Sequence, residues 1–197
     1  MHDLTTEIAA AAARAVVEDG LEYGSAKHHA LKQLGLPPRT ALPSNEMLEA
    51  AVLEHIAIFC ADTQPAELLA LRQMALLWME RLTEFRPHLS GAVWRGTATR
   101  LSDIYIQLYC DDSKSAEIML INQGIRYEPG TLRGFAGLEV GVLSLQVPCK
   151  ALQARVGIHL LNYDLDDLRQ APRNDAGGQS LRGSLTALKA LLATSAL

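Results

Sequence analysis

The chain has 197 residues, of which 49% are hydrophobic and 20% charged, and its formal net charge is −4 at pH 7. This length and composition suit a globular protein with one sizeable core, or a small domain with a helical extension. The acidic balance gives no electrostatic reason to expect a nucleic-acid backbone as a partner.

The cysteines indicate the cellular compartment. Cys60, Cys110 and Cys149 are odd in number and far apart in the sequence, which favours free thiols over a zinc site or a disulfide framework. The N-terminal residues lack the basic region of a signal peptide, and no stretch reaches the roughly 18 apolar residues that a membrane span needs. We therefore expect a cytoplasmic protein with no membrane anchor.

Residues 1–85 are predicted to be helical. Apolar residues recur there at helical spacing, and Ser, Thr, Asp, Gly and Pro mark the helix ends. We expect helices from Thr5 or Thr6 to about Glu18, from Ser25 to Leu34, from near Ser44 to about Ala61, and from Asp62-Thr63 to a point before Pro87.

The pattern changes after Pro87. Strands are expected at Ile104–Cys110, Ile125–Thr131, Leu138–Val147 and Val156–Tyr163, and helices at Ser113–Gln123 and Ser184–Leu192. A turn containing Pro148 is expected between the last two strands, and the polar residues 164–183 are predicted to form a loop. The fold class expected is α+β, with a helical N-terminal region at 1–85 and a mixed β-sheet domain flanked by helices at 86–197.

Two glycines and an acidic residue form the most informative segment. Gly91 and Gly96 indicate a loop in which the backbone turns tightly or approaches another group closely. Ser102-Asp103 leads directly into the strand at Ile104–Cys110. A carboxylate at the start of a buried strand lies where a sheet opens to solvent, which suits a metal or a phosphate-bearing ligand.

Residues 89–112 resemble the signature of the minimal nucleotidyltransferases, relatives of the DNA polymerase β fold. That signature is a strand ending in Gly-Ser, a short helical turn with a further Gly, and Ser-Asp-x-Asp at the start of the next strand. Gly91-Ala92 stands in the place of Gly-Ser, Gly96 and Ala98-Thr99 match the middle, and Ser102-Asp103-Ile104 begins the Asp pair. The resemblance covers about residues 75 to 163.

The resemblance implies a chemistry and a set of site residues. Three carboxylates would hold two Mg²⁺ ions, which bind an NTP and stabilise the charge that develops as a nucleoside monophosphate is transferred. Asp103 would then be the catalytic residue and a metal ligand. The residues implied in nucleotide or phosphate binding are Gly91, Ala92, Arg95, Gly96, Arg100 and Ser102.

The sequence departs from this pattern in three places. Ala92 lacks the hydroxyl of Ser, Tyr105 replaces the second Asp, and Gly141 stands where the third carboxylate is expected. Glu139 and His159 are accessory candidates, together with Tyr105. One hypothesis is that the Tyr105 ring packs against the bare Gly141, which would leave a dry, filled site instead of a metal site.

Several of these residues also have a structural interpretation. Arg95 and Arg100 suit phosphate contacts, but also suit exposed loop charges. Trp94 could stack on a base, although we favour its anchoring the glycine turn on the core. For His159, in the middle of a strand, we favour a structural role over one in a cleft.

Three functions follow as hypotheses. The first is nucleotidyl transfer from an NTP to an unknown acceptor at a degraded metal site. The second is a non-catalytic nucleotide-binding or regulatory module that keeps the fold. The third is an interaction protein in which the helices of residues 1–85 act, and self-association through them stays open. The sequence contains no P-loop, Rossmann, nucleophile-elbow or His-Glu-x-x-His motif.

Overall fold

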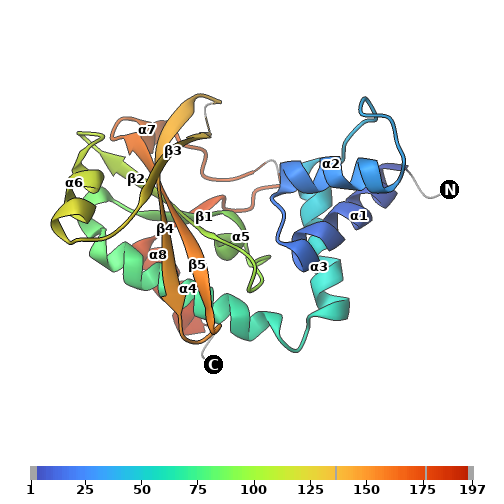
Figure 1. The fold of residues 1–197 in the computed structure, drawn as a ribbon, viewed down its shortest axis with the longest axis horizontal. Coiled ribbons are helices and arrows are strands. Elements are labelled where there is room, and N and C mark those ends of the chain that lie inside the picture. The colour runs from blue at the N-terminus through green and yellow to red at the C-terminus, as the bar shows by residue number, and fades with distance from the viewer. Residues whose placement is uncertain (1–3, 136, 176, 195–197) are drawn as a thin grey trace. The chain divides into compact units, whose positions relative to one another are not determined.

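A computed structural model describes residues 4–135, 137–175 and 177–194 (Figure 1). Within these residues the fold is α+β, with eight α-helices and a six-stranded mixed sheet, so the predicted fold class is confirmed. The chain divides into two compact units. One comprises Met1–Glu67 with Thr97–Leu101, and the other comprises Leu68–Gly96 with Ser102–Leu197.

The first unit is built from three helices, α1 (Leu4–Asp19), α2 (Tyr23–Gln33) and α3 (Asn45–Phe59). The alanine run of α1 is buried against the other two helices, because small side chains let helix backbones approach closely. Gly20, with φ +69°, follows α1 in the left-handed conformation that often ends a helix. The Ser44 hydroxyl caps α3 by accepting a hydrogen bond from the Met47 N–H at 3.1 Å.

The second unit contains the sheet and the remaining helices. Its elements are α4 (Gln64–Arg81, which begins in the first unit), β1 (His88–Ser90), α5 (Gly91–Arg95), β2 (Ile104–Cys110), α6 (Ser115–Asn122), β3 (Glu128–Arg133), β4 (Glu139–Cys149), β5 (Ala154–Asp164), α7 (Asp167–Gln170), β6 (Arg182–Ser184) and α8 (Leu185–Thr194). A 3₁₀ turn at Thr83–Phe85 follows α4.

The strands lie in the order β3-β4-β5-β2-β1-β6. All neighbours are antiparallel except β2 and β5, which run parallel at the centre of the sheet. A parallel pair needs a long crossover connection, and here α6 with the β3–β4 hairpin supplies it. As a result, β5 rather than β4 lies beside the strand that follows Asp103.

The two faces of the sheet differ sharply. Ile104, Ile106 and Leu108 of β2 and Ile158 and Leu160 of β5 are fully buried on one face. In Figure 1, α4 and α8 pass behind the strands, and α8 packs along β1 and β6. The period of two along a strand places the alternate residues of β2 and β5 on the opposite face.

This opposite face carries one polar residue from each strand in a single transverse row. The strand registers align Glu128, Ser144, His159, Tyr105, Ser90 and Arg182 across β3, β4, β5, β2, β1 and β6. One step along the sheet, Leu161 and Tyr163 are covered by Leu165, Leu168 and Ala171 around α7. The face is therefore closed at the α7 end, and it offers polar groups at the end where β2 begins.

Two expectations for loops need correction. Pro148 lies inside β4, paired with Arg155, and the turn follows at residues 150–153. The predicted loop at 164–183 contains α7 and the first residues of β6. Arg182 holds this segment by hydrogen bonds to the Tyr109 hydroxyl and to the Leu168 carbonyl at 3.1 Å. Such distant contacts leave no local pattern in a polar sequence.

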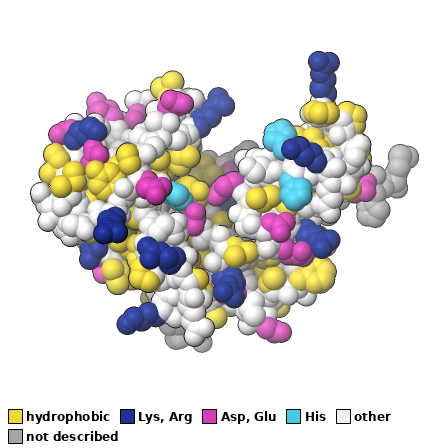
Figure 2. Space-filling model, in the orientation of Figure 1, with side chains coloured by type: hydrophobic (Ala, Val, Ile, Leu, Met, Phe, Trp, Pro, Cys, Tyr) yellow, Lys and Arg dark blue, Asp and Glu magenta, His cyan; other side chains and the backbone are white. Residues whose placement is uncertain are grey.

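On the face drawn in Figure 2, several lysine and arginine side chains gather at the lower left, where acidic side chains are few. Elsewhere on this face basic, acidic and uncharged side chains are mixed. Among the helices in the described part of the chain, none is both long and apolar enough to cross a bilayer.

Candidate functional site

Asp103 stands directly before β2 and is held by β5. Its Oδ1 accepts a hydrogen bond from the Gly157 N–H at 3.0 Å, and its Oδ2 accepts one from His159 Nε2 at 3.0 Å. The second imidazole nitrogen, Nδ1, lies 2.9 Å from the Ser144 hydroxyl on β4. Asp103, His159 and Ser144 therefore form a hydrogen-bonded chain across three strands, which we call the Asp–His–Ser chain.

The carboxylate determines the proton positions in this chain. An ionised carboxylate only accepts hydrogen bonds, so His159 carries a proton on Nε2. In the neutral ring Nδ1 is then an acceptor, and the Ser144 hydroxyl donates to it. The hydrogen bond from His159 holds the pKa of Asp103 below its ordinary value, although partial burial opposes this shift.

Gly157 makes room for the carboxylate. A Cβ on Gly157 would lie 2.5 Å from the Cγ of Asp103 and 2.7 Å from its Oδ2, far inside van der Waals contact. Only a residue without a side chain lets the carboxylate rest on the β5 backbone and receive its N–H. The Asp–His–Ser chain thus depends on a glycine 54 positions away from Asp103.

Tyr105 fills the space between His159 and the glycine turn. Its ring stacks on the His159 ring with centroids 4.7 Å apart and an interplanar angle of 27°. A Cβ on Gly91, whose φ is +68°, would lie 3.6 Å from the Tyr105 ring. The hypothesis that Tyr105 packs against Gly141 is wrong, since nothing lies within 4 Å of a Cβ built there. β5 separates β4 from β2, which keeps the two residues apart.

The strand order also determines which residues stand beside Asp103, and they differ from those that the resemblance implies. The neighbour of β2 is β5, so His159, not a residue of β4, pairs with Tyr105. Glu139 begins β4, five positions before Ser144, which is roughly 17 Å along a strand. The later strand that lies beside Asp103 is therefore β5, and at this position it carries the imidazole of His159 and no carboxylate.

The glycine turn is observed as the short helix α5, which ends at Gly96 with φ +88°. Arg72 of α4 donates hydrogen bonds from Nε to the Val93 carbonyl at 3.0 Å and from Nη2 to the Trp94 carbonyl at 3.1 Å. Partial burial lowers the pKa of Arg72. This arginine therefore satisfies carbonyls that the end of a helix leaves without a partner.

Side chains of the turn are engaged within the protein. Trp94 packs on Gly183, and its Nε1–H donates to the Ser180 carbonyl at 3.0 Å, which confirms the anchoring interpretation. Arg95 forms an ion pair with Asp175 at 2.8 Å, and its side chain is 15% exposed. This pairing competes with any role of Arg95 toward a phosphate.

The other residues of the predicted set have separate surroundings. Ala92 is half-buried in α5 and offers no hydroxyl. Ser102 is half-buried immediately before Asp103. Arg100 belongs to the first unit, where its backbone N–H donates to Glu67 Oε2 at 2.9 Å while the residue is exposed.

The residues around Asp103 do not fit a two-metal site. In the ranges that the structure describes, no three His, Cys, Asp or Glu residues gather closely enough to hold a metal ion. Mg²⁺ takes several oxygen ligands. Asp103 is a single carboxylate with both oxygens hydrogen-bonded, and the residues of the row that stand beside it carry an imidazole, His159, and a phenol, Tyr105.

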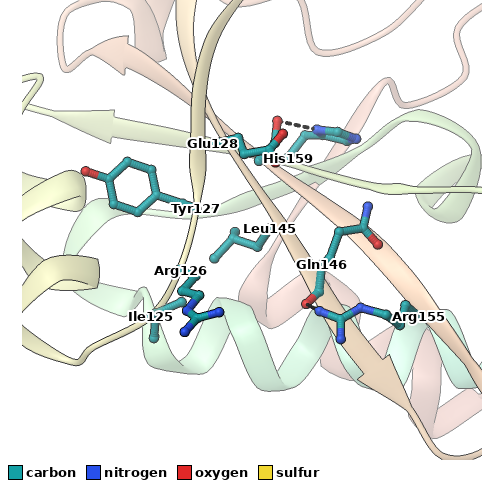
Figure 3. Close-up of a pocket in the computed structure, with 9 residues that line it drawn as sticks. Ile125, Arg126, Tyr127, Glu128, Leu145, Gln146, Arg155 and His159 are labelled. Carbon is teal, nitrogen blue, oxygen red and sulfur yellow. Dashed lines mark hydrogen bonds between the residues drawn. The ribbon is translucent and has the colours of Figure 1, made fainter.

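A pocket of about 760 Å³ lies on the other side of His159 from the glycine turn (Figure 3). Its walls come from the segment before β3 and from β3, β4 and β5. They are formed by Ile125, Arg126, Tyr127, Glu128, Ser144, Leu145, Gln146, Arg155 and His159. Of these, only His159 is among the site residues that the sequence predicts. Ser144 and Gln146 interrupt an apolar strand at alternate positions, and this signal could have indicated them.

A Ser–His–Asp series is also the arrangement that activates a nucleophilic serine. Ser144, however, lies within β4 and is paired with Glu128 on one side and His159 on the other. Backbone N–H groups in such a strand belong to the ladders on either side, so they are not available as an oxyanion hole. Acyl transfer at Ser144 would therefore lack a backbone oxyanion hole.

Comparison with models of protein families, with curated proteins and with solved structures gives no significant match to this chain.

Proposed function

We propose that the second unit is a nucleotidyltransferase-like domain that binds a nucleotide without a metal ion, and that it acts as a binding or regulatory module. One observation carries this proposal. At the start of β2, where two-metal transfer needs several carboxylates, Asp103 is tied to Gly157 and His159, and Tyr105 stacks on His159.

The order of elements supports the fold part of the proposal. A strand ends at Ser90, a helical turn follows from Gly91 to Arg95, and the next strand begins directly after Asp103. This is the order that the resemblance implies. The polar face and the adjoining pocket support the binding part, because ligand sites are commonly concave and contain a few convergent polar groups.

Nucleotidyl transfer is the competing function, and metal dependence separates the two. We would measure thermal stability with ATP, GTP, CTP and UTP, each in Mg²⁺ and in EDTA. A ligand that binds the native state stabilises it by about 2.7 kcal/mol at 100 times its Kd. For a chain of this size that corresponds to roughly 5–11 °C.

If the second unit is a non-catalytic module, a nucleotide should raise the melting temperature in EDTA, and Mg²⁺ should not enlarge this increase. Asp103→Asn is the matched variant, because it keeps the shape of the side chain and removes its charge. It should leave metal-free nucleotide binding within about threefold of wild type. A shift that needs Mg²⁺ and disappears in Asp103→Asn would favour the transferase. No shift with any nucleotide would refute the proposal and favour action by the helical unit.

We also propose a reducing, cytoplasmic location, since Cys60, Cys110 and Cys149 are all free. Self-association through the first unit is a separate proposal. It rests on Ile58 and Phe59 of α3, which are 62% and 70% exposed. Sedimentation of the wild type and of a Phe59→Ser variant would test it, and a monomer in both would refute it.

A further inference from the structure

The pocket beside the Asp–His–Ser chain has two chemically different ends. Figure 3 shows the guanidinium groups of Arg126 and Arg155 at one end of the pocket and His159 at the other. Glu128 lies near the His159 end in the same view, and strand register places it in the same row as His159. One end is therefore basic, and the other combines an acid with hydrogen-bonding groups.

The basic end has unused donors. Arg155 donates one hydrogen bond, from Nη2 to the Gln146 carbonyl at 2.6 Å. A guanidinium has five N–H groups in a fixed plane, so this bond orients the group and leaves further donors. Arg126 makes no hydrogen bond or ion pair with any residue that the structure describes. A guanidinium matches the geometry of a phosphate or carboxylate oxyanion, and two of them line this pocket.

The opposite end suits a hydrogen-bond donor. Glu128 has no hydrogen-bond or ion-pair partner within the described ranges. While His159 is neutral, its Nδ1 takes the Ser144 proton, so the free lone pairs of the Ser144 oxygen can accept a bond from a ligand. Asp103 behind His159 adds negative potential. A hydroxyl or ammonium group of a ligand would be favoured here, and an anion would not.

We propose that this pocket binds a small molecule with an oxyanion, phosphate or carboxylate, between Arg126 and Arg155 and a hydroxyl or amine beside Glu128 and Ser144. The inference rests on the proposed function, in that the second unit binds ligands without a metal. It adds where the ligand lies and which chemical groups it carries. The volume of about 760 Å³ falls within the range usual for small-molecule sites.

Titration calorimetry of the full chain in EDTA tests both ends. Ethyl phosphate and propionate serve as oxyanion probes, and phosphoethanolamine adds an amine to the phosphate. We expect Arg126→Met and Arg155→Met each to weaken binding of the preferred oxyanion by about five- to tenfold, the effect of losing one charge-assisted hydrogen bond at an exposed site. Arg133→Met is the matched control. It is an exposed arginine of β3 outside the pocket, and its variant should bind as wild type does.

The donor end has its own readout. Phosphoethanolamine should bind several-fold more tightly than ethyl phosphate, and Glu128→Gln should abolish most of that preference. Three outcomes would each overturn the proposed pocket site. They are an equal loss of affinity in the Arg133 control, affinity within twofold of wild type in both pocket variants, and no binding of any probe. If nucleotides bind equally well to the wild type and to the Arg126 and Arg155 variants, this inference is refuted but the proposed function is not. If the probes bind and no nucleotide binds, the proposed function is refuted but this inference is not.

Discussion

Replacing Gly157 by Ala should break the Asp–His–Ser chain at its origin. The added Cβ would lie 2.5 Å from the Cγ of Asp103, so the carboxylate must move away. It would lose its hydrogen bonds to the Gly157 N–H and to His159. Hydrogen bonds to charged groups contribute about 1.5–3 kcal/mol each when buried.

The exposure of Asp103 limits this cost. Its side chain is 41% exposed, so solvent screens the interactions and can hydrate the displaced carboxylate. We therefore expect a loss of about 1 kcal/mol per bond, or about 2 kcal/mol in all. In a chain of this size, that lowers the melting temperature by roughly 4–8 °C.

Circular dichroism melting at pH 7 measures the effect, and two further variants make it specific. Gly141→Ala is the matched control, because Gly141 lies in the same sheet with nothing within 4 Å of a Cβ, and it should change the melting temperature by less than about 2 °C. In an Asp103→Ala background, Gly157→Ala should cost little, since the clashing atoms are gone. The reasoning fails if Gly157→Ala melts like the control, or if its cost is the same in both backgrounds.

Three more predictions follow from ionisation and exposure. The lowered pKa of Asp103 means that its contribution to stability is present above about pH 4 and is lost as pH falls through its folded pKa. The difference in melting temperature between wild type and Asp103→Asn should therefore shrink between pH 5 and pH 3, and a constant difference would contradict this. Burial raises the pKa of Tyr109 to about 12 and also raises the pKa of Tyr163, so alkaline titration at 295 nm should show late phenols, with one fewer in Tyr109→Phe. Burial also raises the pKa of Cys110 to about 11, and Cys149 is buried, so iodoacetamide should modify the half-buried Cys60 first. Equal labelling of all three thiols in the folded protein would count against the packing around β2 and β4.

The longer elements could be predicted because their signals are local. The alanine run of α1, the Ser44 cap of α3 and the alternating residues of β2 each act within a few positions of the chain. β1 and β6 have three residues each, too few for a periodic pattern to show. Their formation depends on pairing with each other and with β2.

The site could be predicted only in part. Asp103 stands out because an acidic residue before an apolar strand is visible in the sequence. Ser144 and Gly157 are ordinary residues of two apolar strands, and nothing near them in the chain indicates a carboxylate. Arg126 and Arg155 are 29 positions apart, and they line one pocket because β3, β4 and β5 pair in series.

By itself, the amino-acid sequence determined that the chain begins with helices, continues into a mixed sheet and presents Asp103 at the start of β2. These features follow from backbone propensity and from periodic burial, which act over a few residues. The tertiary structure alone decided that β5 lies beside β2 and thereby placed His159, Gly157 and Ser144 around that carboxylate. Strand order depends on contacts between residues that are far apart in the chain, because it is determined by the burial of one whole face of the sheet.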